Sequence, residues 1–522
     1  MDAIHVAVVA FIVVLLMPIL IYLRDVKGLR KYPAAGPFGI AALTPLWLMY
    51  HNWSGVRWKA IKNAHQQHGS IVRISPNHLS FTDPDAYKEI YGHKADIVKD
   101  VFYSNMAGNT PNMADATDRV DHARKRKHFA AIFSAKNVAM LEPRVQACVT
   151  KLVECLKIKA GGGMVAETDR FPVSLDGSFD IRPWLNMFTY DAISSMMWSE
   201  SFGFLDRGDD SCVAEAADGA TKTVHAMQTF QDSVWFSVFC AHLPPLAYEA
   251  LRFLSSRSAW QLTIPLGQIA RYKTNKRLGV LPEQQDIFAQ FPTASDDGKG
   301  RHSLPMWELV AESSVMLNAG NDTTQTTLTN NLLLLSLHPE IQSKLRAILI
   351  SAIPASSRPV ASYSTLSQIS YLRAVIDESF RILTPQRFGL PRRTVSPSTI
   401  AGHVIPPAVT VSSPLSELHV NPALFSKPRE WIPERWLADS EGFGGASERA
   451  NLKEYVMPFT TGARACIGRN LAYMEVSIAL AALVMQFEWM LGEGGPEECF
   501  GQFERITSNP TKLVVRVRPV EA

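Results

Sequence analysis

The feature that most constrains this chain is a ten-residue stretch near its C-terminal end, which places a single cysteine between two glycines. The stretch reads Phe459-Thr460-Thr461-Gly462-Ala463-Arg464-Ala465-Cys466-Ile467-Gly468. An apolar segment follows directly and predicts a buried helix, so Cys466 should lie close to a helix N-terminus. Unpaired N–H groups and the positive end of the helix dipole favour a thiolate over a thiol at such a place. The glycines let the backbone pass close to a flat, bulky object, and Phe459 can cover the sulfur.

A cysteine thiolate presented in this way is suited to be an axial ligand of haem iron. The alternative is a buried cysteine in a glycine-rich turn, which is the commoner environment of a lone cysteine. The complete spacing decides between the two, because Phe-x-x-Gly-x-Arg-x-Cys-x-Gly resembles the haem-binding loop of the cytochrome P450 superfamily. This resemblance implies that Cys466 ligates the haem iron and that Phe459 and Arg464 contribute to cofactor binding.

Length and composition limit the other possibilities. The chain has 522 residues, 47% of them hydrophobic, which suffices for one large catalytic domain or roughly two to three ordinary ones. The 52 Lys and Arg residues nearly balance the 49 Asp and Glu residues, so there is no basic footprint for nucleic acid. The six cysteines include no CxxC pair, which indicates a reducing compartment and argues against a disulfide framework or a zinc site.

The N-terminal segment predicts a membrane anchor. Val6 to Leu23 is an apolar run interrupted only by Pro18, and its length is close to the roughly 20 residues that span a bilayer. A cleaved signal peptide is the alternative, but no Lys or Arg precedes the run and no small-residue cleavage site follows it. Basic residues come directly after the run, so the remaining chain should face the cytosol. We therefore expect an anchor over residues 1–24, a Pro- and Gly-containing linker over 25–40 and one domain over 41–522.

The first part of the domain alternates short helices and strands. The expected elements are a helix over 55–69, strands over 71–74 and 78–81, and a short helix from about 83 to 92. Phe102 to Thr117 has little periodicity and predicts a long loop, which in a compact domain is often functional. Residues 137–300 should be mostly helical, most clearly over 184–204 and in the stretch after Pro245.

A very long helix is predicted from Ser303 to about Leu337. Its middle, Ala319-Gly320-Asn321-Asp322-Thr323-Thr324, is unfavourable for a helix, because glycine costs about 1 kcal/mol relative to alanine and Asn, Asp and Thr are weak helix formers. We expect side chains here to take over backbone hydrogen bonds and open the helix locally, with a tolerated kink as the alternative. The segment resembles the Ala-Gly-x-Asp-Thr-Thr oxygen-activation motif of the family. Gly320 would then let a flat cofactor and O₂ approach the backbone, while Asp322 and Thr323 relay protons.

A basic run follows the predicted loop. His122 and Arg126 are four residues apart and share one face of a helix, while Arg124, Lys125 and Lys127 spread over the others. Such a run is a solvated face or a localisation signal, or it belongs to the cofactor site. The P450 family carries Trp-x-x-x-Arg here, and both members bond a haem propionate; the resemblance implies this role for Arg126 and for His122 in place of the tryptophan. The surplus basic residues would let an acidic electron-donor protein dock.

Three further charged residues are weak signals individually. Glu378 and Arg381 lie at i and i+3 on one predicted helix face, where an exposed pair would contribute only about 0.3 kcal/mol. Arg435 occurs later, in the sequence Pro433-Glu434-Arg435-Trp436. The resemblance implies that these three form a buried charge network that supports the cysteine loop, for which the planar fork of arginine is suited.

The segment from Gly389 to Val395 resembles the family's strand whose arginine reaches a haem propionate. We favour Arg392 for this role, with Arg393 as the alternative. Phe388 and Leu390 would then face the substrate.

The four motifs occur in the family's order and extend from about residue 30 to the C-terminal end. The resemblance therefore implies the cytochrome P450 fold, mainly α with small β-sheets and a long central helix over the haem. It also implies a haem b cofactor, with electrons from NADPH delivered by a separate NADPH–cytochrome P450 reductase and with cytochrome b5 as a further donor. Short stretches around His68–Arg73, Asp121–Lys127 and Asn421-Pro422 are similar to fungal microsomal members, including those that hydroxylate benzoate-type aromatics or tailor secondary metabolites.

These similarities imply a monooxygenase of the endoplasmic reticulum membrane, single-pass and with a cytosolic catalytic domain, that hydroxylates a small apolar or aromatic substrate. One alternative is a haem-thiolate isomerase or dehydratase that needs no external electrons, and the Asp322-Thr323 pair argues against it. The other is a non-catalytic haem sensor or electron carrier, which would not need the long loop and the large helical region.

Overall fold

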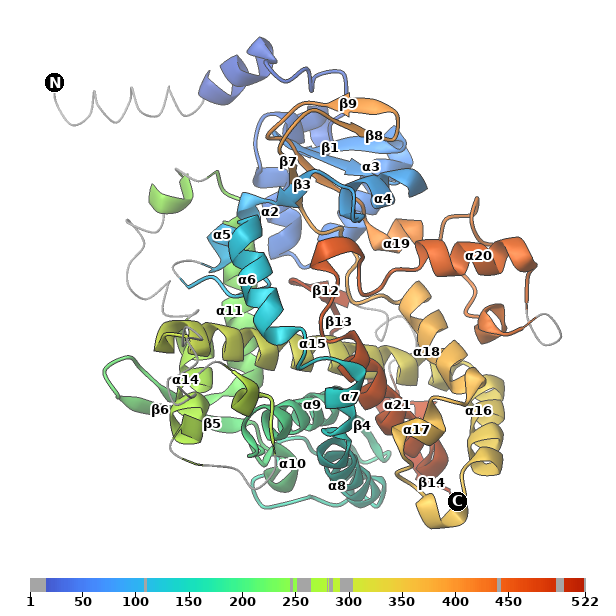
Figure 1. Ribbon diagram of the computed structural model, residues 1–522. Helices are drawn as coiled ribbons and strands as arrows, with labels where there is room; N and C mark the ends of the chain where they lie inside the picture. The colour runs from blue at the N-terminus through green and yellow to red at the C-terminus, as the bar shows by residue number, and fades with distance from the viewer. Residues whose placement is uncertain are drawn as a thin grey trace.

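The computed structural model describes residues 16–107, 110–244, 247–250, 264–278, 280, 285–291, 304–438, 443–493 and 502–520. Helices form the body of the molecule, and a β-sheet lies toward one end, as Figure 1 shows. The expected fold class, mainly α with small β-sheets, is confirmed.

Helices occur along the whole described chain, and most of them belong to the body of the molecule. The first half of the chain contains η1 (Pro37–Ala42), α2 (Leu46–Trp53), α3 (Arg57–His68), α4 (Pro84–Tyr91), α5 (Val101–Ala107), α6 (Arg119–Phe129), α7 (Ala135–Ala139), α8 (Glu142–Ala160), α9 (Arg182–Trp198), α10 (Phe204–Arg207) and α11 (Ala226–Ala241). The second half contains α14 (Ile264–Leu278), η2 (Phe288–Gln290), α15 (Met306–Leu337), α16 (Pro339–Ala352), η3 (Ala355–Ser357), α17 (Tyr363–Leu366), α18 (Ser370–Ile382), α19 (Leu415–Leu418), η4 (Pro433–Trp436), α20 (Ala446–Tyr455), η5 (Gly462–Arg464) and α21 (Arg469–Gln486).

The strands form one mixed sheet and several short pairs. They are β1 (Ile71–Ser75), β2 (His78–Phe81), β3 (Ile97–Lys99), β4 (Ser178–Asp180), β5 (Ser211–Glu215), β6 (Thr221–His225), β7 (Arg392–Thr394), β8 (Ser398–Ile400), β9 (His403–Ile405), β10 (Thr410–Ser412), β11 (Phe487–Leu491), β12 (Gln502–Glu504), β13 (Ser508–Pro510) and β14 (Val514–Pro519). The largest sheet has the order β1-β2-β10-β7-β3, and β11-β14-β4 form a second. In the large sheet β7 pairs antiparallel with β3, which places Arg392 opposite Lys99.

The helix α15 lies at the centre of the molecule and crosses the middle of Figure 1. It is 32 residues long and buried along most of its length, where it packs against α9 and α21. Its backbone is helical throughout, so the predicted local opening at 319–324 is wrong. Thr323 Oγ1 donates a 2.7 Å hydrogen bond to the Ala319 carbonyl, but a carbonyl oxygen can accept a second bond without losing its helical partner.

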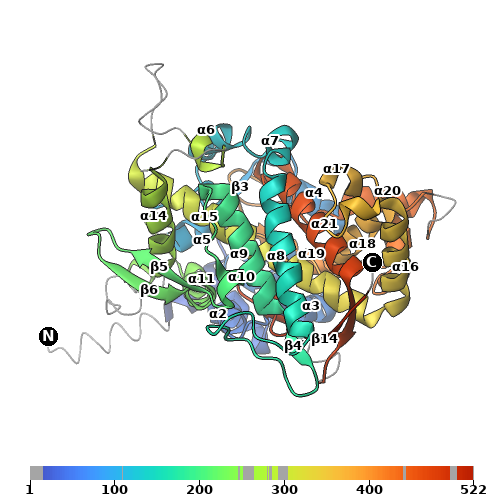
Figure 2. The same cartoon turned by 90° about the horizontal axis from the view of Figure 1, so that it is seen from below.

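Three helices form the base of the main hydrophobic core. Viewed from below, α8 and α9 run side by side with α21 next to them (Figure 2). Apolar side chains from all three, among them Leu152, Trp184 and Leu480, are fully buried in one cluster together with those of α15. This packing fixes the start of α21, and therefore the cysteine loop before it, relative to α15.

The N-terminal segment gives a mixed outcome. Among the described residues, no helix has the length and apolar character needed to cross a bilayer. Most of the predicted anchor, residues 1–15 of 1–24, lies outside the described part of the chain. The interval 25–40, predicted to be a linker, packs onto the domain: Leu29 and Tyr32 are buried, and Ala35 N–H donates to the Arg73 carbonyl at 2.9 Å.

Most of the predicted helices and strands agree with the structure, and the regions 102–117 and 137–300 differ in part. The helices α3, α4, α6 and α15 and the strands β1 and β2 lie where the patterns predicted them. The expected loop over 102–117 instead contains α5, because Phe102 and Tyr103 are buried against Val238 of α11. The expected helical region over 137–300 contains the β5–β6 hairpin, and α9 ends at Trp198 because Ser199 adopts a left-handed conformation. The predicted helix after Pro245 falls largely on residues outside the described part.

Candidate active site

The loop before α21 presents Cys466 between tightly packed backbone segments. Cys466 N–H donates to the Phe459 carbonyl at 2.9 Å, and α21 begins three residues later with Gly468 at its N-cap. Gly462 has a φ of +75°, and a Cβ there would approach the Tyr91 carbonyl oxygen to 2.3 Å, so only glycine fits. The absence of a side chain at Gly462 therefore makes room for the end of α4. At Gly468 the space is open, because no atom lies within 4 Å of the position that a Cβ would take.

The Cys466 side chain is accessible, although the surrounding protein is close enough to affect its ionisation. Burial raises the pKa of the thiol above its usual value, while a hydrogen bond from Gly468 N–H and the charges of Arg126 and Arg469 lower it. The predicted influence of the helix N-terminus is present but weaker than desolvation. A metal ion bound at this sulfur would further favour the thiolate.

Phe459 is held in place by aromatic side chains from two helices. Its ring centroid lies 5.2 Å from that of Phe380 in α18 and 5.1 Å from that of Tyr473 in α21. Tyr473 OH in turn donates to Asp377 Oδ1 at 2.7 Å. The cysteine loop is therefore packed from both sides by elements distant in sequence.

Positive side chains converge beside the cysteine loop. The cluster consists of Lys99, His122, Arg126, Arg392 and Arg464. Burial, followed by the charges of Arg464 and Lys99, lowers the pKa of His122 to about 3, so its imidazole is neutral and keeps one N–H donor. Burial and the neighbouring Arg392 lower the pKa of Arg464 to about 10. Asp115 lies near Lys99, and its negative charge raises the pKa of Lys99, which burial and the neighbouring arginines lower.

The hydrogen bonds of this cluster leave donor capacity for an anion. Arg126 Nη1 donates to the Ala465 carbonyl at 2.8 Å, and Arg464 Nη1 donates to the Ala116 carbonyl at 2.7 Å. Arg392 Nη1 donates to Tyr103 OH at 3.3 Å. A guanidinium has five N–H donors, so each retains groups that none of these bonds uses. This surplus of positive charge and donors fits the two propionate groups of a haem placed against Cys466.

Lys99 and Tyr103 join this cluster although the sequence reasoning did not select them. Lys99 Nζ donates to the Ala114 carbonyl and lies 4.0 Å from the centroid of the Tyr103 ring. Lys99 lies opposite Arg392 where β3 pairs with β7. This strand pairing would have indicated Lys99, but a single sequence does not reveal it. Arg393 lies on the other face of β7, where its charge acts on Lys27 and Asp100.

The middle of α15 presents an accessible side within a buried helix. Ala319 is exposed and Thr323, one turn later, is partly accessible, whereas the helix on either side is mostly buried. Gly320 does not face this side: a Cβ there would lie 3.1 Å from Ile193 of α9. The missing side chain therefore serves the contact between α15 and α9, and the role of Gly320 toward a cofactor stays a prediction.

Asp322 points away from Thr323 and toward the β12–β13 hairpin. Its Oδ1 accepts from Asn509 Nδ2 at 3.1 Å, and its Oδ2 accepts from Thr507 Oγ1. Burial raises the pKa of Asp322, while these two donors and Arg182 lower it. The structure thus does not bring the side chains of Asp322 and Thr323 together. No local pattern indicates that Thr507 and Asn509 are the partners of Asp322.

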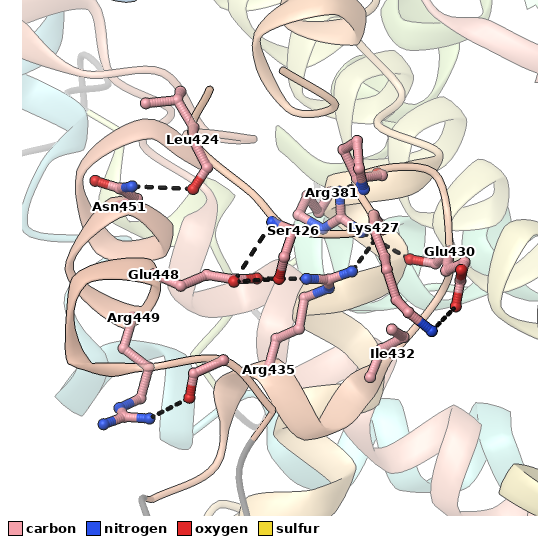
Figure 3. Close-up of polar contacts among 12 residues, drawn as sticks. Arg381, Leu424, Ser426, Lys427, Glu430, Ile432, Arg435, Glu448, Arg449 and Asn451 are labelled. Carbon is pink, nitrogen blue, oxygen red and sulfur yellow. Dashed lines mark hydrogen bonds and ion pairs between the residues drawn. The ribbon is translucent and has the colours of Figure 1, made fainter. Parts of the chain in front are cut away.

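Glu378, Arg381 and Arg435 meet in the interior, all fully buried. Glu378 accepts from Arg381 at 2.7 and 2.9 Å, from Arg435 Nε at 3.2 Å and from the Trp436 indole at 3.0 Å. Arg435 also contacts Glu448 of α20 and the Lys427 carbonyl, as Figure 3 shows. The network connects α18 with the segment that precedes the cysteine loop.

Two of the other basic residues of α6, Arg124 and Lys125, bind carboxylates of α15. Lys125 is 1% exposed and donates to Glu312 of α15 at 2.9 Å and to Glu308 at 2.5 Å. Arg124 also donates to Glu308, while Lys127 is exposed. The prediction that Lys125 helps to dock an electron donor is wrong, because its long side chain reaches buried carboxylates of α15.

A cysteine at the start of a buried helix, a cationic cluster beside it and a central helix with an accessible turn define the class of haem-thiolate proteins. Comparison with known proteins identifies the family: the cytochrome P450 profile matches residues 41–517. Benzoate 4-monooxygenase of Aspergillus niger is 30% identical over 90% of this chain and 89% of its own length. Trichothecene C-15 hydroxylase of Fusarium sporotrichioides is 30% identical over 92% of this chain and 91% of its own length. Cytochrome P450 monooxygenase poxM of Penicillium oxalicum is 27% identical over 98% of this chain and 94% of its own length.

The chain therefore belongs to the cytochrome P450 family and is a monooxygenase. Membership implies haem iron, a small-molecule substrate and a redox partner that supplies electrons.

Proposed function

We propose that this enzyme hydroxylates a small apolar or aromatic substrate with electrons that originate from NADPH. A separate NADPH–cytochrome P450 reductase delivers them, and cytochrome b5 is a further donor. The observation that carries the proposal is the accessible Cys466 sulfur beside a cationic cluster that suits haem propionates. Relatives named benzoate 4-monooxygenase and trichothecene C-15 hydroxylase support a role in aromatic acid turnover or fungal secondary metabolism.

The residues present fit haem b. Cys466 would ligate the iron, and the donors of the cationic cluster, His122, Arg126, Arg392 and Arg464, would hold the propionates together with Lys99. When bound, haem supplies reductive activation of O₂ at its iron. The protein positions the substrate, excludes water and delivers protons.

Thr323 is the residue of α15 that can hold a proton on the accessible side. Its Oγ1–H donates to the Ala319 carbonyl, and the oxygen retains lone pairs that accept from a water or from a second acid. A hydroxyl held in this way can pass one proton on while receiving another, without leaving its position.

Asp322 is the proposed source of that proton, and burial raises the pKa of its carboxyl above the ordinary value. Its present hydrogen bonds to Thr507 and Asn509 point it away from Thr323. Transfer between the two therefore requires a rotation of the Asp322 side chain or a chain of water molecules, and β13 sets how readily the rotation occurs.

A carbon monoxide difference spectrum of the reduced protein tests the cysteine assignment. Cys466 as ligand predicts absorption at the position typical of thiolate-ligated haem, and Cys466→Ser should abolish that band. An unchanged spectrum in the variant would contradict the assignment. NADPH-dependent O₂ uptake with purified reductase then separates the proposal from an electron-independent isomerase or dehydratase and from a sensor, because only a monooxygenase links uptake to a hydroxylated product.

The substrate class is tested by product analysis. Small aromatic acids, neutral aromatics and polyketide-type compounds should be incubated with enzyme, reductase and NADPH, with ¹⁸O₂ as the oxygen source. We expect one labelled oxygen in the product of an aromatic substrate. Conversion of none of these compounds, by enzyme that consumes O₂ normally, would contradict the substrate proposal but not the reaction class.

We also propose attachment to the endoplasmic reticulum membrane through residues 1–24, with the catalytic domain in the cytosol. The run Val6–Leu23 supports it, and Leu20, Ile21 and Leu23 are each more than half exposed. Alkaline carbonate extraction of cell membranes is the test: the full-length chain should stay in the pellet, and release into the supernatant would contradict a spanning anchor.

A further inference from the structure

Arg387 is a buried cation without a hydrogen-bonding partner. It lies between α18 and β7 in the chain and is 6% exposed, and its Nε is buried without an acceptor in the described part of the chain. Its guanidinium carbon lies 4.5 Å from the centroid of the Trp58 ring. Burying an unpaired charge costs several kcal/mol, and for this reason buried arginines are normally bonded to carboxylates or carbonyls. Arg57, Arg381 and Arg435 in this same chain follow that rule.

A second unpartnered donor lies beside the first. The indole Nε1 of Trp58 is buried and has no acceptor among the described residues. Guanidinium and indole groups can only donate, so neither can satisfy the other. Two adjacent donor groups that lack an acceptor indicate a missing acceptor-rich partner.

Further positive charge lies on the same side. Lys62 is four residues after Trp58 on α3 and therefore shares its helix face. Burial lowers the pKa of Lys62, and so do the nearby Arg429 and Arg387, whereas Glu417 of α19 raises it. The acidic groups that act on Arg387 are the buried Glu504, which is paired with Arg57, and Glu417. In the described structure neither carboxylate forms an ion pair with Arg387, Lys62 or Arg429, so positive charge is in excess.

We propose that Arg387, Trp58, Lys62 and Arg429 form a binding site for a phosphate group, separate from the haem site. A tetrahedral oxyanion offers acceptors in several directions at once, which matches donors that come from α3, from the segment before β7 and from the loop after α19. The phosphate group is either inorganic phosphate or the headgroup of an anionic lipid. The neighbouring Gln386 donates to the Ile506 carbonyl at 2.8 Å, so the bound anion would also brace the hairpin that holds Asp322.

Thermal unfolding of the haem-loaded full-length enzyme in detergent tests the site. Inorganic phosphate is titrated at constant ionic strength, with chloride as the reference anion. The wild type should be stabilised saturably, because a ligand that binds only the folded state raises the unfolding temperature. Lys62→Gln and Trp58→Phe should weaken binding about tenfold, as expected for loss of one charge-assisted donor. Lys453→Gln, at an exposed position of α20, is the matched control and should behave like the wild type.

Arg387→Met provides the decisive comparison. In phosphate-free buffer the variant should unfold at a higher temperature than the wild type, because an unpaired buried charge is replaced by an apolar side chain of similar length. It should also lose the response to phosphate. Lower stability without phosphate, or an unchanged phosphate response in this variant or in Lys62→Gln, would overturn the proposal.

Vesicle flotation distinguishes the two sources of the phosphate group. Phosphatidylcholine vesicles with and without phosphatidic acid are compared for the wild type, Lys62→Gln and Lys453→Gln. Tighter binding to the anionic vesicles that only Lys62→Gln loses would identify the lipid headgroup. Equal binding to both vesicles, together with the thermal response, would identify the soluble anion, and absence of both responses in the wild type would overturn the site.

Discussion

Thr323 and Asp322 are neighbours in the chain, but their side chains leave α15 on different sides. Thr323 lies on the partly accessible turn, while Asp322 is buried against β13. A residue step of about 100° around a helix separates adjacent side chains in this way. The proposed proton donor and proton carrier are therefore held apart, and transfer between them would require the Asp322 side chain to leave its partners in the β12–β13 hairpin.

Replacing Thr323 by Ala should uncouple O₂ consumption from product formation. The hydroxyl that holds the proton is lost, and we expect roughly ten- to a hundredfold less product per O₂ consumed, with hydrogen peroxide as the by-product. Product and peroxide are measured against NADPH oxidation. Thr323→Ser keeps the hydroxyl and should stay coupled; if Thr323→Ala were also fully coupled, the assignment of Thr323 would be wrong.

Glu475 of α21 is a buried carboxyl without a partner at its Oε1. Burial raises its pKa to about 8 in the folded protein, whereas the unfolded chain should have the ordinary value of about 4.3. Between these values the folded state holds a proton that the unfolded state releases, so stability should fall as the pH rises and should level off above about pH 8.

Replacing Glu475 by Gln should therefore stabilise the protein at alkaline pH. The variant cannot ionise, so we expect a gain on the order of 4 kcal/mol at pH 8 and little gain near pH 4, from the linkage between the two pKa values. Denaturant unfolding across this pH range is the measurement. Glu454→Gln, at an exposed carboxylate, is the control, and an equal pH slope for wild type and Glu475→Gln would contradict the expectation.

The cysteine loop depends on elements that lie behind it. The network of Glu378, Arg381 and Arg435 joins α18 to η4. Glu448 of α20 pairs with Arg435 (Figure 3). A buried ion pair is weak evidence for net stability, because desolvation opposes the attraction. Its role in this fold is instead to set where α18 and the loop before α21 lie relative to each other.

Replacing Glu378 by Gln should strongly destabilise the protein. The side chain keeps its shape, but two buried guanidinium groups lose their shared negative charge, at a cost of about 3–5 kcal/mol. We expect a lower denaturant midpoint and faster loss of haem to apomyoglobin. Glu454→Gln breaks only the exposed pair with Lys88 and should cost about 1 kcal/mol or less; similar losses in both variants would argue against the network.

At the scale of the whole molecule, the N-terminal segment belongs to the catalytic domain from about residue 29 onward. Leu29 and Tyr32 are buried beneath the large sheet, and Arg73 N–H donates to the Pro33 carbonyl at 2.8 Å. Proline and glycine in this segment had indicated a linker. They occur instead where the chain turns along the edge of β1, with Gly36 at a φ of +82° next to the Trp47 ring.

Two truncations test where the domain begins. Removal of residues 1–24 should leave the thermal unfolding temperature unchanged, because the buried contacts start at Leu29. Removal of residues 1–40 should lower it by several degrees, since it exposes apolar surface that Leu29, Tyr32 and Ala35 cover. Equal stability of the two truncated proteins would contradict this boundary.

Local patterns predicted the elements of this fold well where each element has its own periodicity or capping residue. Asp83 and Asp118 cap α4 and α6 by accepting from backbone N–H groups, as the positions of these residues before each helix suggest. The loop assignment over 102–117 failed for a different reason. Phe102 and Tyr103 form α5 only because α11, far along the chain, provides the surface that buries them.

The sequence by itself determined the chemistry of the site: a lone cysteine before a helix, acid and hydroxyl side chains in the middle of a long helix, and arginines at recognisable spacings. These features depend on residue type and on distances of a few residues, which a single chain displays directly. The tertiary structure alone decided which groups face one another: Asp322 and Asn509 are separated by 187 residues, and Gly320 faces Ile193. Such contacts follow from how buried surfaces of distant elements pack, and no local pattern encodes them.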